Sequence, residues 1–432
     1  MQFKMLFIFT LGLFATYVLG VQYQPEQIHI SFGNNISEIV VTWSTWDKTN
    51  QSVVEYGIGG LISRAVGKWV LFTDGGNEKR KQYIHKVTLS NLLAEETYFY
   101  HCGSDLGWSN VYYFKTLPTS STWSPHFAVF GDLGNVNAQS LPRLQEETQK
   151  GLYDAILHVG DFAYDMDSDN ARVGDAFMRQ LEPIAAYVPY LTCPGNHEEK
   201  YNFSNYRTRF SMSGAPDNMF YSFNIGPAHI ISFNTEYYYF IKYGLKSLIL
   251  QYMWLEKDLK EANKPVNRRK HPWIITFAHR PMYCSNIYAD DCKDEDDIIR
   301  TGIPMLKMFG LEKLFYDNGV DLEIWAHEHS YERLWPVYNR IVLNGSYNEP
   351  YTNPRAPVHI TTGSAGCDEF ISKFVNNPPN WSAFRSTDYG YTRMKIHNSS
   401  HLCLEQISDD KDGKIIDHIC IVKDQHRLYN SI

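Results

Sequence analysis

The ten residues Ala155-Ile-Leu-His-Val-Gly-Asp-Phe-Ala-Tyr164 decide the fold class of this chain. Their first half is mostly apolar and has the length of a fully buried strand, and the Gly-Asp pair that follows ends it. The same plan occurs at Phe127–Asp132, where Phe-Ala-Val-Phe precedes Gly131 and Asp132. Short buried strands that alternate with helical stretches are typical of a layered α/β domain.

Outward from these stretches, helical and extended patterns alternate through the second part of the chain. The helices predicted from apolar periodicity are 140–151, 171–186, 246–262 and 305–318. The predicted strands are 127–130, 155–159, 187–193, 273–277, 321–325 and 358–362, with further strands within 392–421. We therefore expect an α/β domain over residues 119–432.

The first part of the chain has a different pattern. Residues 22–118 contain short runs that alternate with period two, separated by polar turns, and no helical period. The stretch from Leu92 to Tyr98 is similar to the tyrosine corner of immunoglobulin-like and fibronectin-like sandwiches. We predict a β-sandwich domain at 21–118, joined to the second domain by the linker 118–125, with a plain all-β region as the alternative.

Composition and targeting signals indicate a secreted globular protein. The chain has 432 residues, 44% of them hydrophobic, and a net charge of −8 without a basic stripe, which argues against nucleic-acid binding. The apolar run Met5–Leu19 after Lys4 predicts a signal peptide over residues 1–20, and no other run reaches the length of a transmembrane helix. We expect secretion or delivery to the lysosome. Six glycosylation sequons agree with the secretory pathway: Asn35, Asn50, Asn202, Asn344, Asn380 and Asn398.

Seven cysteines also fit an oxidising compartment. Cys284 and Cys292 could close a short loop, and Cys403 and Cys420 flank a predicted hairpin, although spacing alone does not fix the connectivity. An odd number leaves at least one free thiol, so both a monomer and a homodimer stay open.

Polar residues follow five of the predicted buried strands. They are Asp132; Asp161 and Tyr164; Asn196 and His197; His279; and His327 and His329. Sites in α/β sheets form at the carboxyl ends of strands. One such Asp is usually a turn residue and one such His is usually a core residue, but five strand ends that all carry them point to a site. Oxygen and imidazole donors without thiolates suit iron, zinc or manganese, and two ions would fit if Asp161 bridged them.

In these motifs the chain resembles a purple acid phosphatase of the metallophosphoesterase superfamily, of the animal high-molecular-weight type with an N-terminal fibronectin-like domain. The motifs are Gly131-Asp-Leu-Gly134, Gly160-Asp-Phe-Ala-Tyr164, Gly195-Asn-His-Glu198, His279-Arg-Pro and Ala326-His-Glu-His329. The resemblance covers essentially all of the chain after the predicted signal peptide. It implies a β-sandwich followed by a calcineurin-like domain with α-β-β-α layers.

Two positions separate this family from the general superfamily. Gly134 stands where the general motif has a metal-binding His, and Tyr164 stands where it has an Asp. A phenolate is a hard donor that suits Fe(III), and only a strongly polarising cation would keep it ionised at acid pH, because the ordinary tyrosine pKa is about 10. The alternative for Tyr164 is a packed aromatic residue.

The resemblance implies two metal sites that share Asp161. The Fe(III) site would use Asp132, Asp161, Tyr164 and His329. The divalent site, for zinc, manganese or Fe(II), would use Asp161, Asn196, His279 and His327.

The charges of this centre predict phosphate chemistry. Five positive charges, less two carboxylates, one phenolate and one hydroxide, leave about one positive charge to attract a phosphate. A metal-bound hydroxide would attack in line, and a trivalent ion would make it available at acid pH. We expect Asn196, His197 and His279 to bind substrate, and His197 to act as the catalytic residue that assists the leaving group; the alternative is that His197 only orients its neighbours.

One departure affects the substrate side. The large plant enzymes of the family carry a His pair after the residue that matches His279, and this chain does not. Asn286, Tyr288 and Asp290 are possible substitutes. The expected function is a secreted acid phosphatase acting on small phosphate monoesters. Alternatives are a phosphodiesterase or pyrophosphatase on the same scaffold, or an inactive binding protein, against which the complete ligand set argues.

Overall fold

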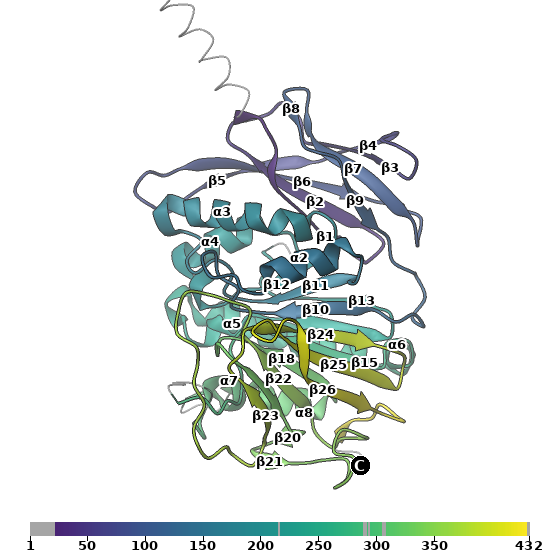
Figure 1. The fold of residues 1–432 in the computed structure, drawn as a ribbon, viewed down its shortest axis with the longest axis vertical. Coiled ribbons are helices and arrows are strands. Elements are labelled where there is room, and N and C mark those ends of the chain that lie inside the picture. Colours follow the sequence, from purple (N-terminus) through teal and green to yellow (C-terminus); the bar gives the residue numbers. More distant parts are fainter. Residues whose placement is uncertain (1–21, 215–216, 288–291, 293, 305–307, 430–432) are drawn as a thin grey trace, which may run out of the picture.

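A computed structural model describes residues 22–214, 217–287, 292, 294–304 and 308–429 (Figure 1). The predicted signal peptide lies outside these residues, and so do Tyr288 and Asp290. Among the described residues, no helix combines the length and the apolar character needed to cross a membrane.

The N-terminal domain is the β-sandwich that the sequence predicts. One sheet has the order β1-β2-β6-β5, and the other has the order β4-β3-β7-β8 with β9 paired to β7. The strands are β1 Glu26–Phe32, β2 Ile39–Thr45, β3 Val53–Gly57, β4 Ser63–Val66, β5 Lys68–Thr73, β6 Lys81–Leu89, β7 Thr97–Ser104, β8 Gly107–Trp108 and β9 Tyr112–Lys115. The Leu93 N–H donates to the Tyr98 hydroxyl at 2.9 Å, which is the bond of a tyrosine corner.

Two sheets form the centre of the second domain. The six-stranded sheet has the order β12-β11-β10-β24-β25-β26, and the seven-stranded sheet has the order β13-β14-β15-β18-β22-β19-β23. In the first, β10 is His126–Phe130, β11 Ala155–Val159, β12 Tyr190–Cys193, β24 Gly390–Ile396, β25 His401–Ser408 and β26 Lys414–Val422. In the second, β13 is Tyr221–Ile225, β14 Ala228–Ser232, β15 Trp273–Phe277, β18 Leu322–Trp325, β19 Tyr331–Leu334, β22 Val358–Thr362 and β23 Ser382–Ser386.

Helices cover the outer faces of these sheets. They are α2 Leu141–Gln149, α3 Ser168–Ala185, α4 Lys200–Arg209, α5 Leu245–Ala262, α6 Pro265–Lys270, α7 Ile298–Thr301 and α8 Leu311–Asp317. Figure 1 shows α2 and α3 between the six-stranded sheet and the N-terminal domain. On the other sheet, Phe315 of α8 packs edge-on against Phe233, and Gln251 of α5 bonds both backbone groups of Asn234. The α-β-β-α layering is therefore confirmed.

The predicted helix at 305–318 is wrong at its start. Met308–Phe309 forms β17, which pairs antiparallel with β16, Gly302–Ile303, and the helix begins only at Leu311. Phe309 has a φ of 68°, which ends any helical continuation on its N-terminal side. Residues 305–307 lie outside the described residues.

The two domains join through a buried polar network. Asp175 of α3 receives hydrogen bonds from Arg209 at 2.8 Å, Gln82 at 2.6 Å, Arg80 at 2.8 Å and Gln27 at 3.3 Å. Three of these four donors come from the N-terminal domain. The relative position of the sandwich and the catalytic layers is thus held by charge and hydrogen bonding as well as by apolar packing.

The structure pairs both cysteine couples that the sequence singled out, as Cys284–Cys292 and Cys403–Cys420. The three remaining thiols are all buried, so a disulfide dimer through any of them would require opening of the core: Cys102, Cys193 and Cys367. Five of the six sequon asparagines are exposed, and Asn344 is partly buried.

Candidate functional site

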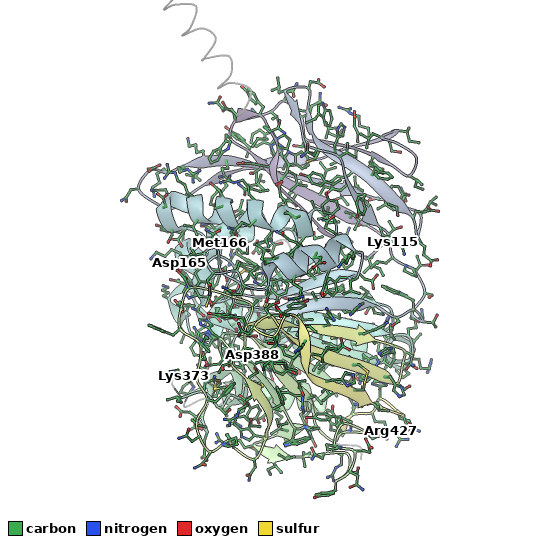
Figure 2. All side chains as sticks on the ribbon, viewed as in Figure 1. Lys115, Asp165, Met166, Lys373, Asp388 and Arg427 are labelled. Carbon is green, nitrogen blue, oxygen red and sulfur yellow. A yellow bond between two sulfur atoms is a disulfide. The ribbon has the colours of Figure 1, made fainter. Side chains whose placement is uncertain are left out.

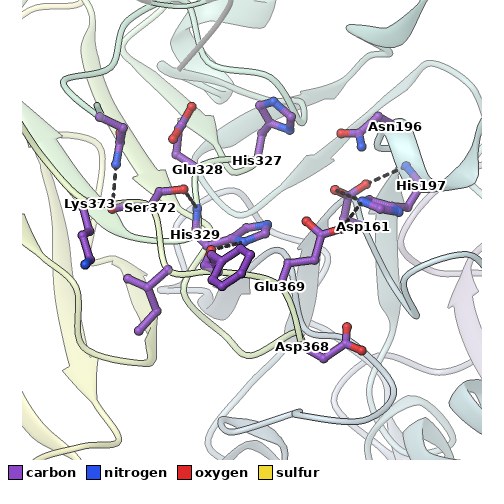
Figure 3. Close-up of a pocket in the computed structure, with 13 residues that line it drawn as sticks. Asp161, Asn196, His197, His327, Glu328, His329, Asp368, Glu369, Ser372 and Lys373 are labelled. Carbon is purple, nitrogen blue, oxygen red and sulfur yellow. Dashed lines mark hydrogen bonds and ion pairs between the residues drawn. The ribbon is translucent and has the colours of Figure 1, made fainter. Parts of the chain in front are cut away.

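The five strand ends named above converge on one site, which borders a pocket lined by Asp161, Asn196, His197, His327 and His329. β10, β11 and β12 reach it from the six-stranded sheet, and β15 and β18 reach it from the seven-stranded sheet. The pocket has a volume of about 640 Å³. Figure 3 shows Asp161, Asn196 and His197 on one side of it and His327, Glu328 and His329 on the other. The site therefore lies between the two sheets.

The turns that carry these residues have unusual backbone geometry. Asp132, Asp161, Tyr164 and His327 have φ values of 56°, 51°, 56° and 70°, in the left-handed region. Non-glycine residues in this region cost about 1–3 kcal/mol each, and such strain is concentrated at functional sites. The preceding Gly160 is also required, because a Cβ there would lie 2.6 Å from Nδ1 of His279.

One cluster of donor atoms contains the tyrosine. The Tyr164 hydroxyl lies 2.7 Å from Nε2 of His329 and 3.2 Å from Oδ1 of Asp132. His329 Nε2 in turn lies 3.5 Å from the same carboxylate oxygen. Phenol, imidazole and carboxylate thus meet at one point, which is a donor set for a hard trivalent cation.

The second cluster contains Asp161 and two histidines. The ligand atoms of Asp161, His279 and His327 all lie within 4.8 Å of one another. Nε2 of His279 is 3.0 Å from Oδ2 of Asp161 and 3.1 Å from Oδ1 of Asn196. His327 differs from the others, because its Nε2 faces the Arg280 guanidinium at 3.0 Å, a contact that a bound cation would have to displace.

Hydrogen bonds from the backbone orient both clusters. Nδ1 of His279 faces the Val159 carbonyl, and Nδ1 of His329 faces the Phe370 carbonyl, each at 2.9 Å. These bonds place the proton on Nδ1 and leave Nε2 with a lone pair for a metal. Asp132 and Asp161 each accept a backbone N–H on one oxygen, from His327 and His197, so that the other oxygen points into its cluster.

Glu198 holds two of these turns together. Its carboxylate accepts the backbone N–H groups of Asp161, Phe162 and Gly195 at 2.8–3.0 Å. Burial and the repulsion from Asp161 raise the pKa of Glu198 to about 8. The sequence contains this residue in the third motif, but nothing in the motif indicates that it clamps the turn of the second.

The pKa values report a strong negative field. Burial lowers the pKa of His279, but Asp161 and Asp132 outweigh it and raise the pKa to about 9. In the same way Asp132 outweighs burial at His329 and raises its pKa to about 12. Burial and the two carboxylates raise the pKa of the Tyr164 phenol well above its ordinary range. This is the field that metal cations neutralise, so the donor chemistry of both clusters fits a pair of metal ions.

Gly134 makes room for a cysteine that sequence reasoning missed. A Cβ at Gly134, whose φ is 76°, would lie 2.6 Å from Cα of Cys367. The Cys367 thiol lies 3.4 Å from Nδ1 of His329 and is fully buried. A His at position 134 is therefore excluded by space as well as absent from the sequence.

His197 lies beside both clusters. Its Nδ1 is 2.9 Å from Asp165, and its Nε2 is 3.9 Å from Asp161 and 3.5 Å from Glu369. Its ring packs at 4.4 Å from that of Tyr164. Burial lowers the pKa of His197, but Asp161 and Asp165 outweigh it and raise the pKa to about 10, so these carboxylates favour the protonated imidazole.

The structure thus brings all seven candidate ligands and His197 into one site: Asp161, Asn196, His197, His327 and His329 line the pocket, and Asp132, Tyr164 and His279 contact these residues from behind its wall. Of the three candidates in the loop after His279, Asn286 lines the pocket, and the other two lie outside the described residues. Residues 368–373, which the sequence analysis did not single out, form a further wall. Figure 2 places Asp165 and Lys373, which border this region, on the same lateral side of the molecule.

Three family models match consecutive parts of the chain. "Purple acid Phosphatase, N-terminal domain" matches residues 25–116, "Calcineurin-like phosphoesterase" matches 125–331, and "Iron/zinc purple acid phosphatase-like protein C" matches 356–418. Together they span both domains.

Individual relatives agree with these models. "Acid phosphatase type 7" of Danio rerio is 57% identical over 421 residues, which are 96% of this chain and 94% of that protein. "Fe(3+)-Zn(2+) purple acid phosphatase 12" of Arabidopsis thaliana is 29% identical over 397 residues, or 87% of this chain and 80% of that protein. The structure of purple acid phosphatase PPD1 from yellow lupin superposes with a TM-score of 0.78 at 24% identity, and the match covers 95% of this chain and 76% of that one.

Proposed function

This chain belongs to the purple acid phosphatases, and we propose that it is a secreted or lysosomal phosphomonoesterase that acts on small phosphate esters at acid pH. Its membership makes it a metallophosphoesterase of the acid phosphatase type with an Fe(3+) and divalent metal centre. The predicted signal peptide, the paired cysteines and the exposed sequons support the secretory route.

One observation carries the proposal. The Tyr164 hydroxyl lies between His329 and Asp132, and Gly134 leaves no space for the histidine of the general superfamily. We assign Asp132, Asp161, Tyr164 and His329 to Fe(3+), and Asp161, Asn196, His279 and His327 to the divalent ion. When bound, the two metals supply Lewis-acid charge and a hydroxide nucleophile at acid pH.

The other residues of the pocket bind the ester and move the proton. His197 lines the pocket, and Asp165 holds its Nδ1 at 2.9 Å, so that Nε2 is the nitrogen available to a substrate. From there it donates a hydrogen bond to the phosphoryl group and then its proton to the leaving alkoxide oxygen. Asn196, which lies beside His197, and His279, 3.1 Å from Asn196, are the further residues expected to bind and orient the phosphate. General acid assistance of this kind contributes roughly 10²–10⁴-fold to the rate.

The proposal is tested on the purified full chain. We expect about two metals per chain, a violet absorption band, and hydrolysis of an aryl phosphate near pH 5. Tyr164→Phe should abolish the violet band, because the band arises from a phenolate bound to Fe(III).

Three other results would each overturn part of the proposal. A colourless wild-type enzyme with two divalent ions would contradict the Fe(III)–tyrosine assignment but keep the phosphoesterase. A protein that hydrolyses no phosphate ester after reconstitution with iron and zinc would contradict the function itself. Retention of the signal sequence on a protein confined to the cell interior would contradict the proposed route.

A further inference from the structure

The wall of the pocket beside the candidate metal ligands is rich in negative charge. Glu328, Asp368 and Glu369 line it with three carboxylates, and Lys373 is the single cation among the described lining residues from 368 to 373. Figure 3 shows Asp368 and Glu369 beside the opening between the two groups of candidate ligands. A phosphate ester bound at the metals would direct its alcohol portion toward this wall.

We propose that residues 368–373 form a leaving-group subsite that selects phosphate monoesters whose alcohol carries an ammonium group. This inference rests on the proposed phosphomonoesterase function and names its substrate class. The metals attract the phosphate, whereas the wall repels a second phosphate and attracts a cation.

The wall is held in a fixed place relative to the site. The Phe370 carbonyl faces Nδ1 of His329, and the Ser372 hydroxyl accepts the His329 N–H, each at 2.9 Å. On the other side of the wall, Asn286 Nδ2 donates to the Ser372 carbonyl at 2.9 Å. The Ile287 N–H donates to the Lys373 carbonyl at 2.7 Å. The subsite therefore keeps a defined distance from the phosphate, as specificity requires.

A buried acceptor adds to the carboxylates. The Asn286 side chain is 1% exposed, and its amide nitrogen is used by Ser330 and the Ser372 carbonyl. Its Oδ1 is buried without a hydrogen-bond partner among the described residues, although Asn286 lines the pocket. A buried unpaired acceptor is costly, so this oxygen is a polar position next to the pocket that a ligand donor would stabilise. An ammonium N–H or an alcohol hydroxyl is such a donor, whereas a phosphate oxygen and a trimethylammonium group are not, so a trimethylammonium ligand tests the charge and the aromatic ring alone.

An exposed aromatic ring completes the subsite. Phe370 is 95% exposed at the pocket wall, which is unusual for this residue type. An aromatic face attracts ammonium and trimethylammonium groups within about 6 Å of its centre. The ring and the carboxylates of Asp368 and Glu369 thus favour the same kind of ligand.

The size of the effect follows from the charges. Glu369 Oε1 lies 3.5 Å from Nε2 of His197, the group that we place at the leaving oxygen. An ammonium group two carbons beyond that oxygen comes within about 5 Å of the carboxylate. In water, the attraction between two unit charges at this distance corresponds to about a fourfold gain in kcat/KM. With Asp368 as a second partner, the combined preference is on the order of tenfold.

The test compares two substrates that differ in charge and not in shape. Phosphocholine and 3,3-dimethylbutyl phosphate have the same outline, and only the first carries a positive charge. The measured quantity is the ratio of their kcat/KM values, determined on the metal-loaded full chain at low ionic strength. Differences in leaving-group chemistry cancel when this ratio is compared between wild type and a variant.

We expect the ratio to fall about tenfold in the double variant Asp368→Asn/Glu369→Gln, and a few-fold in Phe370→Leu, which keeps an apolar side chain. Because Glu369 contacts His197, the single variant Asp368→Asn is measured as well, and it should lower the ratio about fourfold with little change for the neutral ester. Asp105→Asn, in the exposed turn between β7 and β8, is the matched control and should leave the ratio unchanged.

A fall of less than threefold in the double variant, or faster hydrolysis of pyrophosphate than of phosphocholine by wild type, would overturn the inference. Both outcomes require that wild type hydrolyses aryl phosphate. If the metal-loaded wild type hydrolyses none of the esters, the proposed function fails instead, so the two failures are distinguishable.

Discussion

Asp175 should be essential for the stability of the two-domain unit. It is 1% exposed on α3, and both of its oxygens are bonded to cationic groups, at 2.8 Å to Arg209 and 2.8 Å to Arg80. Burial raises the pKa of Asp175, but Arg209 and Arg80 outweigh it, so that the pKa lies below its ordinary value. The carboxylate is therefore ionised wherever the enzyme works, and the attraction to its partners exceeds its cost of desolvation.

Asp175→Asn removes this charge without changing the shape of the side chain. Arg209, itself 1% exposed, would stay buried without a counter-charge. Breaking a buried pair by removing one partner costs about 3–5 kcal/mol. The whole free energy of unfolding of a protein domain is about 5–15 kcal/mol, so this loss is a large share of the total.

Urea denaturation at pH 7, followed by tryptophan fluorescence, measures the change. The direction of the pH dependence follows from the same contacts. Because the pKa of Asp175 is depressed in the folded state, its contribution to the free energy of unfolding is present above about pH 4 and is lost as the pH falls. The variant should therefore approach the wild type in stability at strongly acid pH.

The control removes both charges. Asp175→Leu with Arg209→Met removes both fully buried charges, although the partly exposed Arg80 loses its carboxylate, and it should recover part of the lost stability, because an apolar replacement of a buried pair is often neutral. A loss below about 1 kcal/mol in Asp175→Asn, or an equal loss in the double variant, would refute the reasoning that an uncompensated charge is the cause.

Three further predictions concern the site and the sandwich. Glu198→Gln should weaken metal binding about 10–100-fold, because an amide cannot accept all three backbone N–H groups. Metal retention after dialysis measures this effect, and full retention in a variant with a native circular dichroism spectrum would contradict it. His197→Asn should lower kcat about 10²–10⁴-fold with metal content and the violet band unchanged, whereas loss of metal would show that the residue is only structural. Burial lowers the pKa of His85 to about 4, so its contribution to stability is complete above about pH 6.5 and falls by roughly 3 kcal/mol toward pH 4. The Tm of His85→Gln should therefore decline less steeply than that of wild type over this range, and parallel curves would disprove the assignment.

Much of the fold could be read from local patterns. The strand predicted at 155–159 has the bounds of β11, and the tyrosine corner at Tyr98 is recognisable from a few residues. Both signals are local, because a buried strand shows in a short apolar run and a corner shows in its spacing. The helix predicted from 305 failed because pairing of Met308–Phe309 with Gly302–Ile303 overrode the helical pattern.

The candidate ligands were predictable for the same reason. Each follows directly on a strand, so the sheet topology that the strand–helix alternation implies also brings the strand ends together. The roles of Asp132, Tyr164 and His329 as metal ligands stay predictions, but their proximity follows from sequence order plus the rule for strand ends.

The surroundings of the site depended on tertiary structure alone. His329 and Phe370 are 41 residues apart, and Asp175 and Arg80 are 95 apart, with no periodicity or turn signal to relate them. Such contacts arise from how loops and whole domains pack, which no local pattern encodes. By itself, therefore, the sequence determined the chemistry at the strand ends. Only the packed structure decided which residues surround the phosphate and how the sandwich is fixed to the second domain, because these contacts join segments that are far apart in the chain.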